Sequence, residues 1–469
     1  MKNLLFTVLF VWTLGTQAQN NKKPNVIIIF NDDLGYQDLG CYGSPNIKTP
    51  RVDQLAKEGM RFTDFYSASP VCSASRAALL TGCYPHRVGV AGVIHAGATQ
   101  GLSPKHMTLA EVMKSVGYAT AAVGKWHLGD QPQHLPTNQG FDSFFGIPFS
   151  NDMYPSKNIP YAANCLFNEG FDLEKINALF TNMKPNEKQP ESAKHKVPLM
   201  RNIETIEFPV DQTTITKRYA DEGIQFIKQS VIDKKPFFLY LANSMPHIPL
   251  YVSPQFKGKS KRGLYGDVVE EIDYHTGRIL DLLKELKIDT NTIVIFSSDN
   301  GPWLTKGEDG GSALPLFEGK FTSFEGGMRV PFIIKWPNVI KGGTVSKDLA
   351  ATIDVLPTLA QITNAKLPEI SLDGQSILDL CKNTDHKTPP HEYFFMVYKG
   401  QAVRNGDWKY HKKRTFTVNK NSTIDETPAL YNLKEDVGET KNLINEYPEI
   451  AHRLSQALED HLTRLNIKK

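Results

Sequence analysis

The sequence of 469 residues lacks any apolar run long enough to cross a membrane as a helix. Its longest run, Leu4 to Leu14, falls well short of the roughly 20 residues that such a helix needs. Concentrated basic charge is also missing, because the formal net charge is only +3 and nucleic-acid-binding proteins depend on a clustered basic face. We therefore expect no membrane anchor and no nucleic-acid partner.

Cysteine is scarce, and no cysteine and histidine spacing typical of a zinc site occurs. Spacing alone cannot pair the cysteines, and a chain of this length can fold without disulfides. The sequence also has no internal repeat and no low-complexity tract. With 40% hydrophobic and 22% charged residues, it has the composition of an ordinary globular protein. The five cysteines are Cys41, Cys72, Cys83, Cys165 and Cys381.

The apolar run at the N-terminus is typical of a secretory leader. Lys2 precedes it, and small residues at Thr16 and Ala18 stand where a signal peptidase cleaves. A buried N-terminal strand or helix is the alternative, but the run has no polar face. We therefore predict a signal peptide over residues 1–18 and a periplasmic or secreted protein.

Short apolar runs alternate with helical periodicity along the chain, which predicts an α/β fold with a largely parallel central sheet flanked by helices. The run from Asn25 to Phe30 is rich in β-branched residues and suits a central strand that is buried on both faces. We expect a helix from Pro50 through Glu58 with the Thr49 hydroxyl as its cap, and a long helix from Tyr265 to Leu286. Further strands are predicted over residues 119–123, 237–242, 292–296 and 331–336.

Two changes in composition divide the chain. Residues 156–212 are polar and contain several prolines, so we expect an insertion of loops and short helices that shapes a binding cleft. A polar, proline-rich segment over residues 383–390 marks a boundary between a catalytic domain, residues 19–385, and a C-terminal subdomain, residues 386–469. In that subdomain we predict a small antiparallel sheet and a terminal helix, with strands over 393–398, 407–411, 414–418 and 429–433 and the helix over 449–465.

Acidic and amide side chains directly follow two of the predicted strands. Asp32 and Asp33 come after the first strand, and Asp299 and Asn300 come after a later one. Ligands of α/β sheets bind at the carboxyl ends of the strands, and oxygen-rich side chains are what a hard dication such as calcium prefers. Both segments could instead be simple turns, because Asp-Asp-x-Gly and Ser-Asp-Asn-Gly are also turn compositions.

The most specific motif is the run over residues 72–82, Cys-Ser-Ala-Ser-Arg-Ala-Ala-Leu-Leu-Thr-Gly. A lone cysteine usually packs as a small buried apolar residue. This run, however, resembles the signature of type I sulfatases, Cys-x-(Pro or Ala)-x-Arg followed by Leu-Thr-Gly. The resemblance implies that a maturation enzyme oxidises Cys72 to formylglycine (3-oxoalanine). One hydroxyl of the hydrated aldehyde would attack sulfur, and the other would expel the sulfate.

The resemblance covers about residues 24–445 and contains one departure, because Ala74 stands where proline is commoner. An anaerobic radical-type maturation enzyme tolerates alanine there in related bacterial sequences. The resemblance also implies an alkaline-phosphatase-like fold. It further implies a calcium ion held by Asp32, Asp33, Asp299 and Asn300.

Arg76 lies four residues after Cys72, so a helix that begins near Ser73 brings the two side by side. A surface salt bridge is the alternative role for such an arginine. The resemblance implies that the guanidinium holds the hydrated formylglycine and offsets the charge of the sulfate.

Four further basic residues follow predicted strands or lie in a glycine-bounded loop. Each, taken alone, is more often a solvated lysine or a structural histidine. The resemblance implies that Lys125 anchors the diol and the sulfate, and that His127 accepts the second diol proton as sulfate leaves. It also implies that His247 and Lys320 bind sulfate oxygens and assist the leaving alcohol.

The loop containing Ser150, Asn151 and Asp152 looks like the family's loop near the sulfate, with Asn151 where a histidine often occurs. His95 lies beyond the signature and either lines a sugar site or has a structural role.

The resemblance implies a sulfuric ester hydrolase that acts on a sulfated carbohydrate. Our first expectation for the substrate is an algal polysaccharide fragment of ulvan or carrageenan type, and our second is a glycosaminoglycan fragment. The expected partners are therefore a sulfated oligosaccharide and a formylglycine-generating enzyme. The alternatives are a phosphate or phosphonate monoester hydrolase on the same fold, and a catalytically silent glycan-binding homologue.

Overall fold

A computed structural model describes residues 23–181, 189–382, 390–418 and 423–467. The predicted signal peptide, residues 1–18, and the predicted boundary at residue 385 lie outside the described residues. Within the described part of the chain, no helix is both long and apolar enough to cross a membrane. All five cysteines are free.

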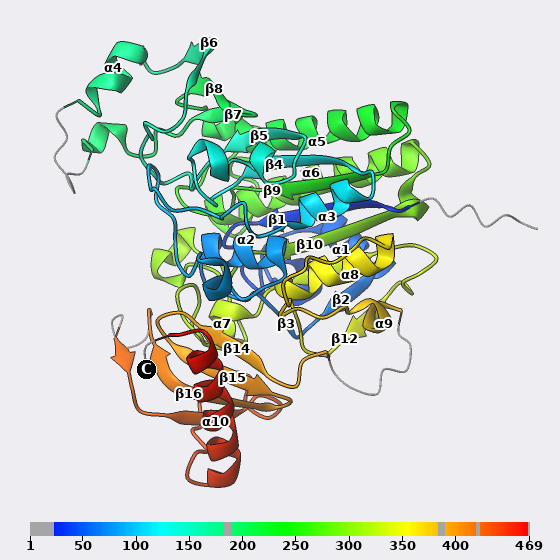
Figure 1. Cartoon of the computed structure of the whole chain (residues 1–469), viewed down its shortest axis with the longest axis vertical. Coiled ribbons are helices and arrows are strands. Elements are labelled where there is room, and N and C mark those ends of the chain that lie inside the picture. Colours follow the sequence, from blue (N-terminus) through cyan, green and yellow to red (C-terminus); the bar gives the residue numbers. More distant parts are fainter. Residues whose placement is uncertain (1–22, 182–188, 383–389, 419–422, 468–469) are drawn as a thin grey trace, which may run out of the picture.

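The centre of the molecule is an 11-stranded sheet whose middle strands are parallel (Figure 1). Its strands run in the order β12, β2, β11, β10, β1, β9, β4, β5, β7, β8, β6. The parallel strands are β1 (Asn25–Asn31), β4 (Ala119–Lys125), β5 (Ser143–Ile147), β9 (Phe237–Ala242) and β10 (Thr292–Ser298). One edge carries β2 (Met60–Phe62), β11 (Phe332–Lys335) and β12 (Thr344–Ser346). All seven residues of β1 are buried, as expected of a central strand covered on both faces.

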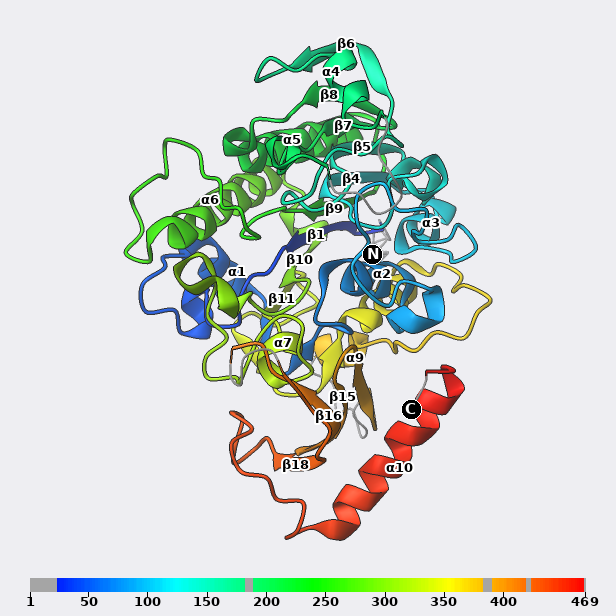
Figure 2. The ribbon, with the colours of Figure 1, turned by 90° about the vertical axis from the view of Figure 1, so that its left-hand side faces the viewer.

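Helices cover both faces of this sheet, which confirms the predicted layers (Figure 2). One face packs against α1 (Pro50–Glu58), α5 (Ile215–Ile232) and α6 (Gly263–Glu285). The other face packs against α2 (Cys72–Thr81), α3 (Leu109–Ser115) and α8 (Val355–Thr363). The shorter elements are β3 (Phe65–Tyr66), β13 (Ala350–Ala351), α7 (Glu325–Met328) and α9 (Leu378–Cys381).

The expectation of loops and short helices over residues 156–212 is wrong in part. The segment contains a short helix, α4 (Leu173–Ala178), but also strands β6 (Tyr161–Phe167), β7 (Leu199–Arg201) and β8 (Glu204–Phe208), which extend the central sheet beyond β5. β7 and β8 span only three and five residues, and none of the seven residues of β6 is fully buried. Periodicity over so few residues is too weak to predict a strand.

The cap predicted for α1 is also wrong. Pro50 occupies the first helical position, but the Thr49 hydroxyl makes no capping hydrogen bond. The Asp273 carboxylate on α6 instead accepts hydrogen bonds from the backbone N–H groups of Arg51 (3.0 Å) and Val52 (2.7 Å). A carboxylate from the neighbouring helix α6 thus accepts hydrogen bonds from the free backbone N–H groups at the N-terminus of α1. No local sequence pattern predicts such a long-range cap.

The C-terminal unit, residues 390–467, is the predicted small antiparallel sheet with a terminal helix (Figure 1). Its details differ from the prediction, because 407–411 and 414–418 form one continuous strand, β16 (Trp408–Thr415), and β15 (Gln401–Asn405) was missed. The lysines in the middle of β16 are typical of a loop. In the structure they belong to the strand, and Lys412 forms an ion pair with Glu459 of the terminal helix at 2.6 Å. The remaining elements are β14 (Phe394–Val397), β17 (Ile424–Asp425), β18 (Ala429–Asn432) and α10 (Pro448–Arg464).

Candidate active site

The two acidic segments lie side by side at the carboxyl edge of the sheet. β1 and β10 pair in parallel up to their last residues, so Asp32 and Asp33 emerge next to Asp299 and Asn300. The backbone N–H of Asp33 donates to Asp299 Oδ1 at 3.1 Å, and Asn300 Nδ2 donates to Asp33 Oδ1 at 2.7 Å. Asp33 adopts a φ of 62°, a left-handed conformation that costs energy for a residue with a side chain. Such local strain is common at functional sites.

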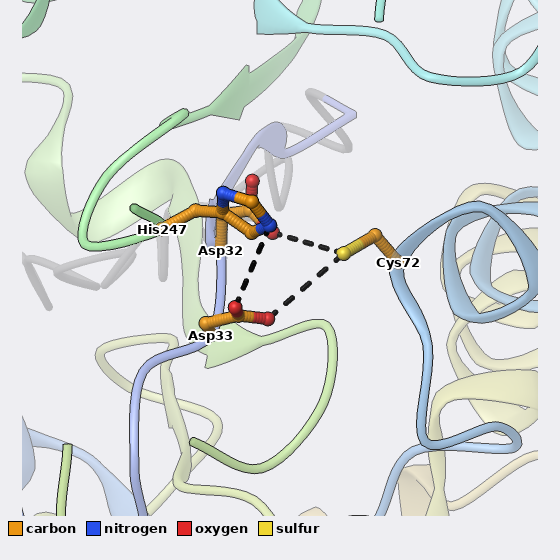
Figure 3. Close-up of side chains that lie close together, drawn as sticks. All are labelled: Asp32, Asp33, Cys72 and His247. Carbon is orange, nitrogen blue, oxygen red and sulfur yellow. Dashed lines mark hydrogen bonds and ion pairs between the residues drawn. The ribbon is translucent and has the colours of Figure 1, made fainter. Parts of the chain in front are cut away.

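Cys72 is the first residue of α2 and is buried against this acidic edge (Figure 3). Its Sγ lies 3.2 Å from Asp32 Oδ1 and 3.3 Å from Lys320 Nζ. Burial raises the pKa of the thiol well above its usual value, and the carboxylates of Asp299 and Asp32 raise it further. The unmodified side chain is therefore a neutral thiol, which is a poor nucleophile.

Arg76 lies one helical turn beyond Cys72 and is fully buried. Its Nε and Nη2 donate to Asp299 Oδ2 at 3.1 and 2.8 Å, and its Nη1 donates to the carbonyl of Lys125 at 3.1 Å. This two-pronged contact fixes the carboxylate in one orientation. Arg76 thus joins α2 to the ends of β10 and β4.

Two lysines complete the charged cluster. Lys125, the last residue of β4, forms an ion pair with Asp32 and donates to Ser150 Oγ at 3.2 Å. Lys320 forms an ion pair with Asp33 at 2.8 Å. The three carboxylates of this edge therefore face three cations. Binding a dication would add two positive charges to this balanced cluster, and the single negative charge of a sulfate ester would offset one of them.

His127 is placed to accept a proton. Its Nε2 lies 3.0 Å from the carbonyl oxygen of Ile94, so this nitrogen carries the ring proton and Nδ1 keeps its lone pair. The Nδ1 atom is buried and has no hydrogen-bond partner among the described residues. Burial and the charge of Lys125 hold the pKa of His127 well below its usual value. The imidazole is therefore neutral.

A chain of hydrogen bonds holds His247 in place. Its Nδ1 lies 2.6 Å from the carbonyl oxygen of Ile248 and 3.2 Å from Asn151 Oδ1, so Nδ1 is protonated and Nε2 faces Asp33 at 3.7 Å (Figure 3). Asn151 in turn donates to Gln212 Oε1 at 3.1 Å. Gln212 was missed from the sequence, and no short motif marks it.

The predicted substrate-binding residues divide into two groups. Ser150 and Asn151 contact Lys125 and His247, and although burial alone would raise it, the pKa of Asp152 is lowered by the electrostatic influence of His247 and Lys125. His95 is exposed, and among the described residues no hydrogen bond joins its side chain to this cluster. The structure therefore brings the first three residues to the site but not His95.

The residues fit a calcium ion. Oxygens of Asp32 and Asp33 lie within 4.8 Å of one another and of Cys72 Sγ and a ring nitrogen of His247. Asn300 Oδ1 is buried without a partner among the described residues, which leaves an oxygen free for a cation. Carboxylate and amide oxygens are the ligands that calcium prefers. Asp299 stands outside the tightest group, because its oxygens already contact Asp33 and Arg76.

Trp303 is a half-buried residue beside this cluster that was also missed from the sequence. Its ring centroid lies 5.6 Å from the His247 ring and 4.7 Å from Lys320 Nζ. The indole N–H donates no hydrogen bond to any described residue. Its position three residues after Asn300 is the only signal that the sequence offers.

The chain is similar to known proteins over nearly its whole described length. A model of the Sulfatase family matches residues 24–365, and a model of the C-terminal region of N-sulphoglucosamine sulphohydrolase matches residues 315–468. Arylsulfatase A from Bos taurus is 36% identical over 475 aligned residues, which cover 97% of this chain and 89% of that protein.

Two solved structures are similar over almost their whole length. The complex of Ps i-CgsB with k-i-k-neocarrahexaose superimposes with a TM-score of 0.76 and 30% identity, covering 94% of this chain and 92% of the other. A protein described in work on the metabolism of multiple glycosaminoglycans by Bacteroides thetaiotaomicron gives a TM-score of 0.79 and 30% identity, covering 94% and 99%. Both matches show the same fold.

Proposed function

We propose that this chain, which belongs to the sulfatase family, removes sulfate from a sulfated carbohydrate through a formylglycine made from Cys72 and with a bound calcium ion. Sulfuric ester hydrolysis itself follows from the family, which argues against both a phosphate or phosphonate hydrolase and a silent homologue. The observation that carries the proposal is the place of Cys72, buried at the start of α2 between an acidic edge and Lys320. The predicted leader supports a periplasmic or secreted protein.

Formylglycine at position 72 would supply, as its hydrate, an oxygen nucleophile and a second hydroxyl whose deprotonation releases sulfate. His127 would take that proton at Nδ1, the buried nitrogen without a partner. Lys125, which pairs with Asp32, would orient the hydrated formylglycine. Asp32, Asp33, Asp299 and Asn300 would hold calcium, whose charge would offset that of the sulfate oxygens.

Lys320 and His247 lie on the side of Cys72 where a leaving alcohol would depart. Lys320 Nζ is 3.3 Å from Sγ, and the pKa of this ammonium is raised because the attraction of Asp33 outweighs burial. It would therefore stay charged and donate hydrogen bonds to the ester oxygens. Nε2 of His247 is the second polar atom on this side.

A sugar is the leaving group that Trp303 favours. A half-buried indole beside Lys320 and His247 offers an apolar face and an unused N–H donor at the place where the leaving group would lie. The apolar and hydroxyl-bearing surfaces of a sugar ring match these two features. The carrageenan oligosaccharide bound by one structural neighbour supports our first substrate class, and the glycosaminoglycan work on another supports the second.

The test has two parts. A mass spectrum of the peptide containing residue 72, from protein made in a host with a maturation enzyme, reads the conversion of cysteine to formylglycine. The matured protein is then assayed on defined sulfated oligosaccharides, an aryl sulfate and an aryl phosphate. Higher kcat/KM on a glycan than on the aryl sulfate is expected. An aryl sulfate that outperforms every glycan would remove the carbohydrate assignment and leave the sulfatase family intact.

A further inference from the structure

Lys320 lies in a loop, residues 318–325, that contacts the C-terminal unit at both ends. We call this segment the Lys320 loop. The proposed role of Lys320 depends on its ammonium lying within reach of residue 72, yet a lysine has four rotatable bonds and no intrinsic preference for that position. The loop backbone must therefore be held.

At its first residue the loop contacts the segment after β16. Oε2 of Glu318 accepts hydrogen bonds from the backbone N–H groups of Thr417 and Val418, both at 3.1 Å, and from the Thr417 hydroxyl at 2.8 Å. Glu318 has a φ of 59° and Phe321 a φ of 74°. Two left-handed residues in so short a segment persist only where the surroundings fix the backbone.

At its last residue the loop contacts a buried network of charges. Glu325 Oε1 accepts from Lys409 Nζ at 2.8 Å, and the backbone N–H of Glu325 donates to Glu439 Oε2 at 2.7 Å. Lys409 also pairs with Glu439 at 3.0 Å, and His411 lies 2.7 Å from the same carboxylate. The four ionisable side chains are fully buried.

The middle of the loop also touches the C-terminal unit. The Phe324 ring lies 5.1 Å from the Phe416 ring and 4.8 Å from the His411 ring. At Gly400, in the turn between β14 and β15, a Cβ would approach Ser323 Oγ to 2.3 Å and Ser323 Cβ to 3.2 Å, so the turn lies in close contact with the loop. The C-terminal unit thus contacts the loop at Glu318 and again over residues 323–325.

Buried ion pairs are a poor way to gain stability, because desolvation of the charges offsets most of their attraction. Their directional hydrogen bonds do, however, fix one geometry. From this arrangement we propose that the C-terminal unit positions Lys320 for the reaction, with Glu318 and Glu325 as positioning residues at the two ends of the loop. The inference rests on the proposed function of Lys320 in holding the sulfate ester.

The other face of the loop shows what this positioning achieves. The backbone N–H of Lys320 donates to the carbonyl of Pro302 at 2.9 Å, and that of Phe321 donates to the carbonyl of Pro70 at 3.0 Å. The loop is therefore held between the C-terminal unit and the residues that lead into Cys72 and follow Asn300. If the contact at Glu318 is lost, the distance between Lys320 Nζ and residue 72 is no longer fixed.

The experiment uses the full matured chain with Glu318→Ala and Glu318→Gln. Glu318→Ala removes the acceptor, and kcat/KM on an aryl sulfate should fall by about tenfold to hundredfold, the loss typical of a small misplacement of a reacting group. Glu318→Gln keeps an acceptor oxygen and should recover most of that loss. The matched control is Glu459→Ala, which breaks the Lys412 ion pair of α10 without touching the loop. It should retain the parent rate.

Two further readouts separate positioning from stability. In a Lys320→Met background, Glu318→Ala should have no additional effect on kcat/KM, because the two residues act through one group. Lys320 is only 3% exposed, so an amine-acylating reagent, read by mass spectrometry, should label it slowly in the parent and faster in Glu318→Ala. Should Glu318→Ala fail to fold, Thr417→Val removes only the hydroxyl donor and should change both readouts in the same direction, by less.

Unchanged labelling of Lys320 in a folded Glu318→Ala protein would overturn the inference, as would equal losses of rate in the parent and Lys320→Met backgrounds. Failure of the proposed function looks different. A parent with confirmed formylglycine that hydrolyses no sulfate ester would overturn that function. The labelling comparison would still decide whether Glu318 holds Lys320.

Discussion

At the scale of single residues, the surroundings of Cys72 suit a modified side chain better than a thiolate. The thiol lies 3.2 Å from one carboxylate and 3.9 Å from another, and its pKa is raised by burial and by negative charge. Cysteine enzymes lower the pKa of their nucleophile with a nearby positive group that exceeds the negative ones. At Cys72 burial and the carboxylates have a stronger influence on the pKa than the lysines do. An unmodified thiol at this position would therefore be a poor nucleophile.

Cys72→Ala should lower kcat by at least about four orders of magnitude while leaving the fold intact, because it removes the nucleophile and only one small buried atom. The measurement is kcat on an aryl sulfate with thermal unfolding in parallel. Cys83→Ala, a buried cysteine just beyond the same helix, is the control and should keep the parent rate. Activity of Cys72→Ala within tenfold of the parent would rule out the covalent mechanism.

Trp303→Ala should lower kcat/KM on sulfated oligosaccharides by about tenfold and change that on a small aryl sulfate much less, because only the larger leaving group covers the indole. Trp303→Phe keeps an aromatic face and should restore part of the loss. Kinetics on both substrate types measure the ratio. Equal losses of kcat/KM on both substrates would show that Trp303 holds His247 in place and does not contact a sugar.

The sequence singles out the residues that the structure gathers at the acidic edge far better than it does the residues around them. Cys72, Arg76 and the acidic pairs belong to short motifs with fixed spacing, and they follow strands whose ends meet at one edge. Gln212 and Trp303 carry no such signal. Gln212 acts on Asn151 from 61 positions away, and only the folded chain brings the two together.

At the scale of elements, long and strongly patterned segments were predictable and short or charged ones were not. β1 and α6 follow from continuous or periodic burial. The sequence predicts two strands in place of β16 because the adjacent, half-buried Lys412 and Lys413 resemble a loop, and β7 and β8 are too short to show a period. Pairing with a neighbouring strand decides these elements, and pairing is a long-range property.

The packing of α10 on the C-terminal sheet should depend on pH through His461. Its ring stacks on Phe395 of β14 with centroids 3.8 Å apart, and burial together with the charge of Arg464 lowers the pKa of His461 to about 3. Since the folded pKa lies below the ordinary value of 6.5, this contribution to stability is complete above that pH. It is lost as pH falls, by up to about 1.4 kcal/mol per unit.

Hydrogen exchange of α10 at a series of pH values measures this effect. Opening of the helix should become easier below about pH 6.5 in the parent and much less so in His461→Phe, which keeps the stacked ring but has no titratable group. His452→Gln, on an exposed position of the same helix, should behave like the parent. A pH response that survives in His461→Phe would assign it to another group.

At the scale of the whole molecule, the active site lies where three parts of the chain meet. The central sheet supplies the acidic edge, α2 supplies Cys72, and the Lys320 loop is held by the C-terminal unit. The insertion strands lie at the opposite end of the longest axis from the C-terminal unit (Figure 1). The geometry of the site therefore depends on all three thirds of the sequence, since His247, Asp299 and Asn300 come from the middle one, and no single stretch could predict it.

The balance of charges in this shared site governs what calcium removal should do. Asp32 and Asp33 are each neutralised by a lysine, so loss of the ion leaves no uncompensated buried charge. Chelation should therefore abolish turnover while the protein stays folded, with a fall in Tm set by the free calcium concentration relative to its Kd. Activity and thermal unfolding are measured on samples whose metal content is known from elemental analysis.

Two variants separate binding of the ion from integrity of the site. Asn300→Ala removes a neutral ligand together with its hydrogen bonds to Asp33 and to the carbonyl of Gly301, and should raise the calcium Kd and lower the Tm of the metal-free protein modestly. Asp299→Ala also leaves the buried Arg76 guanidinium unpaired, and should destabilise even the metal-free protein by about 3 to 5 kcal/mol. In the absence of calcium, Asp299→Ala should therefore be the more destabilising of the two variants, because only it leaves a buried charge unpaired. Full activity of a rigorously metal-free parent would show that the acidic edge serves Arg76 and the two lysines and not a cation.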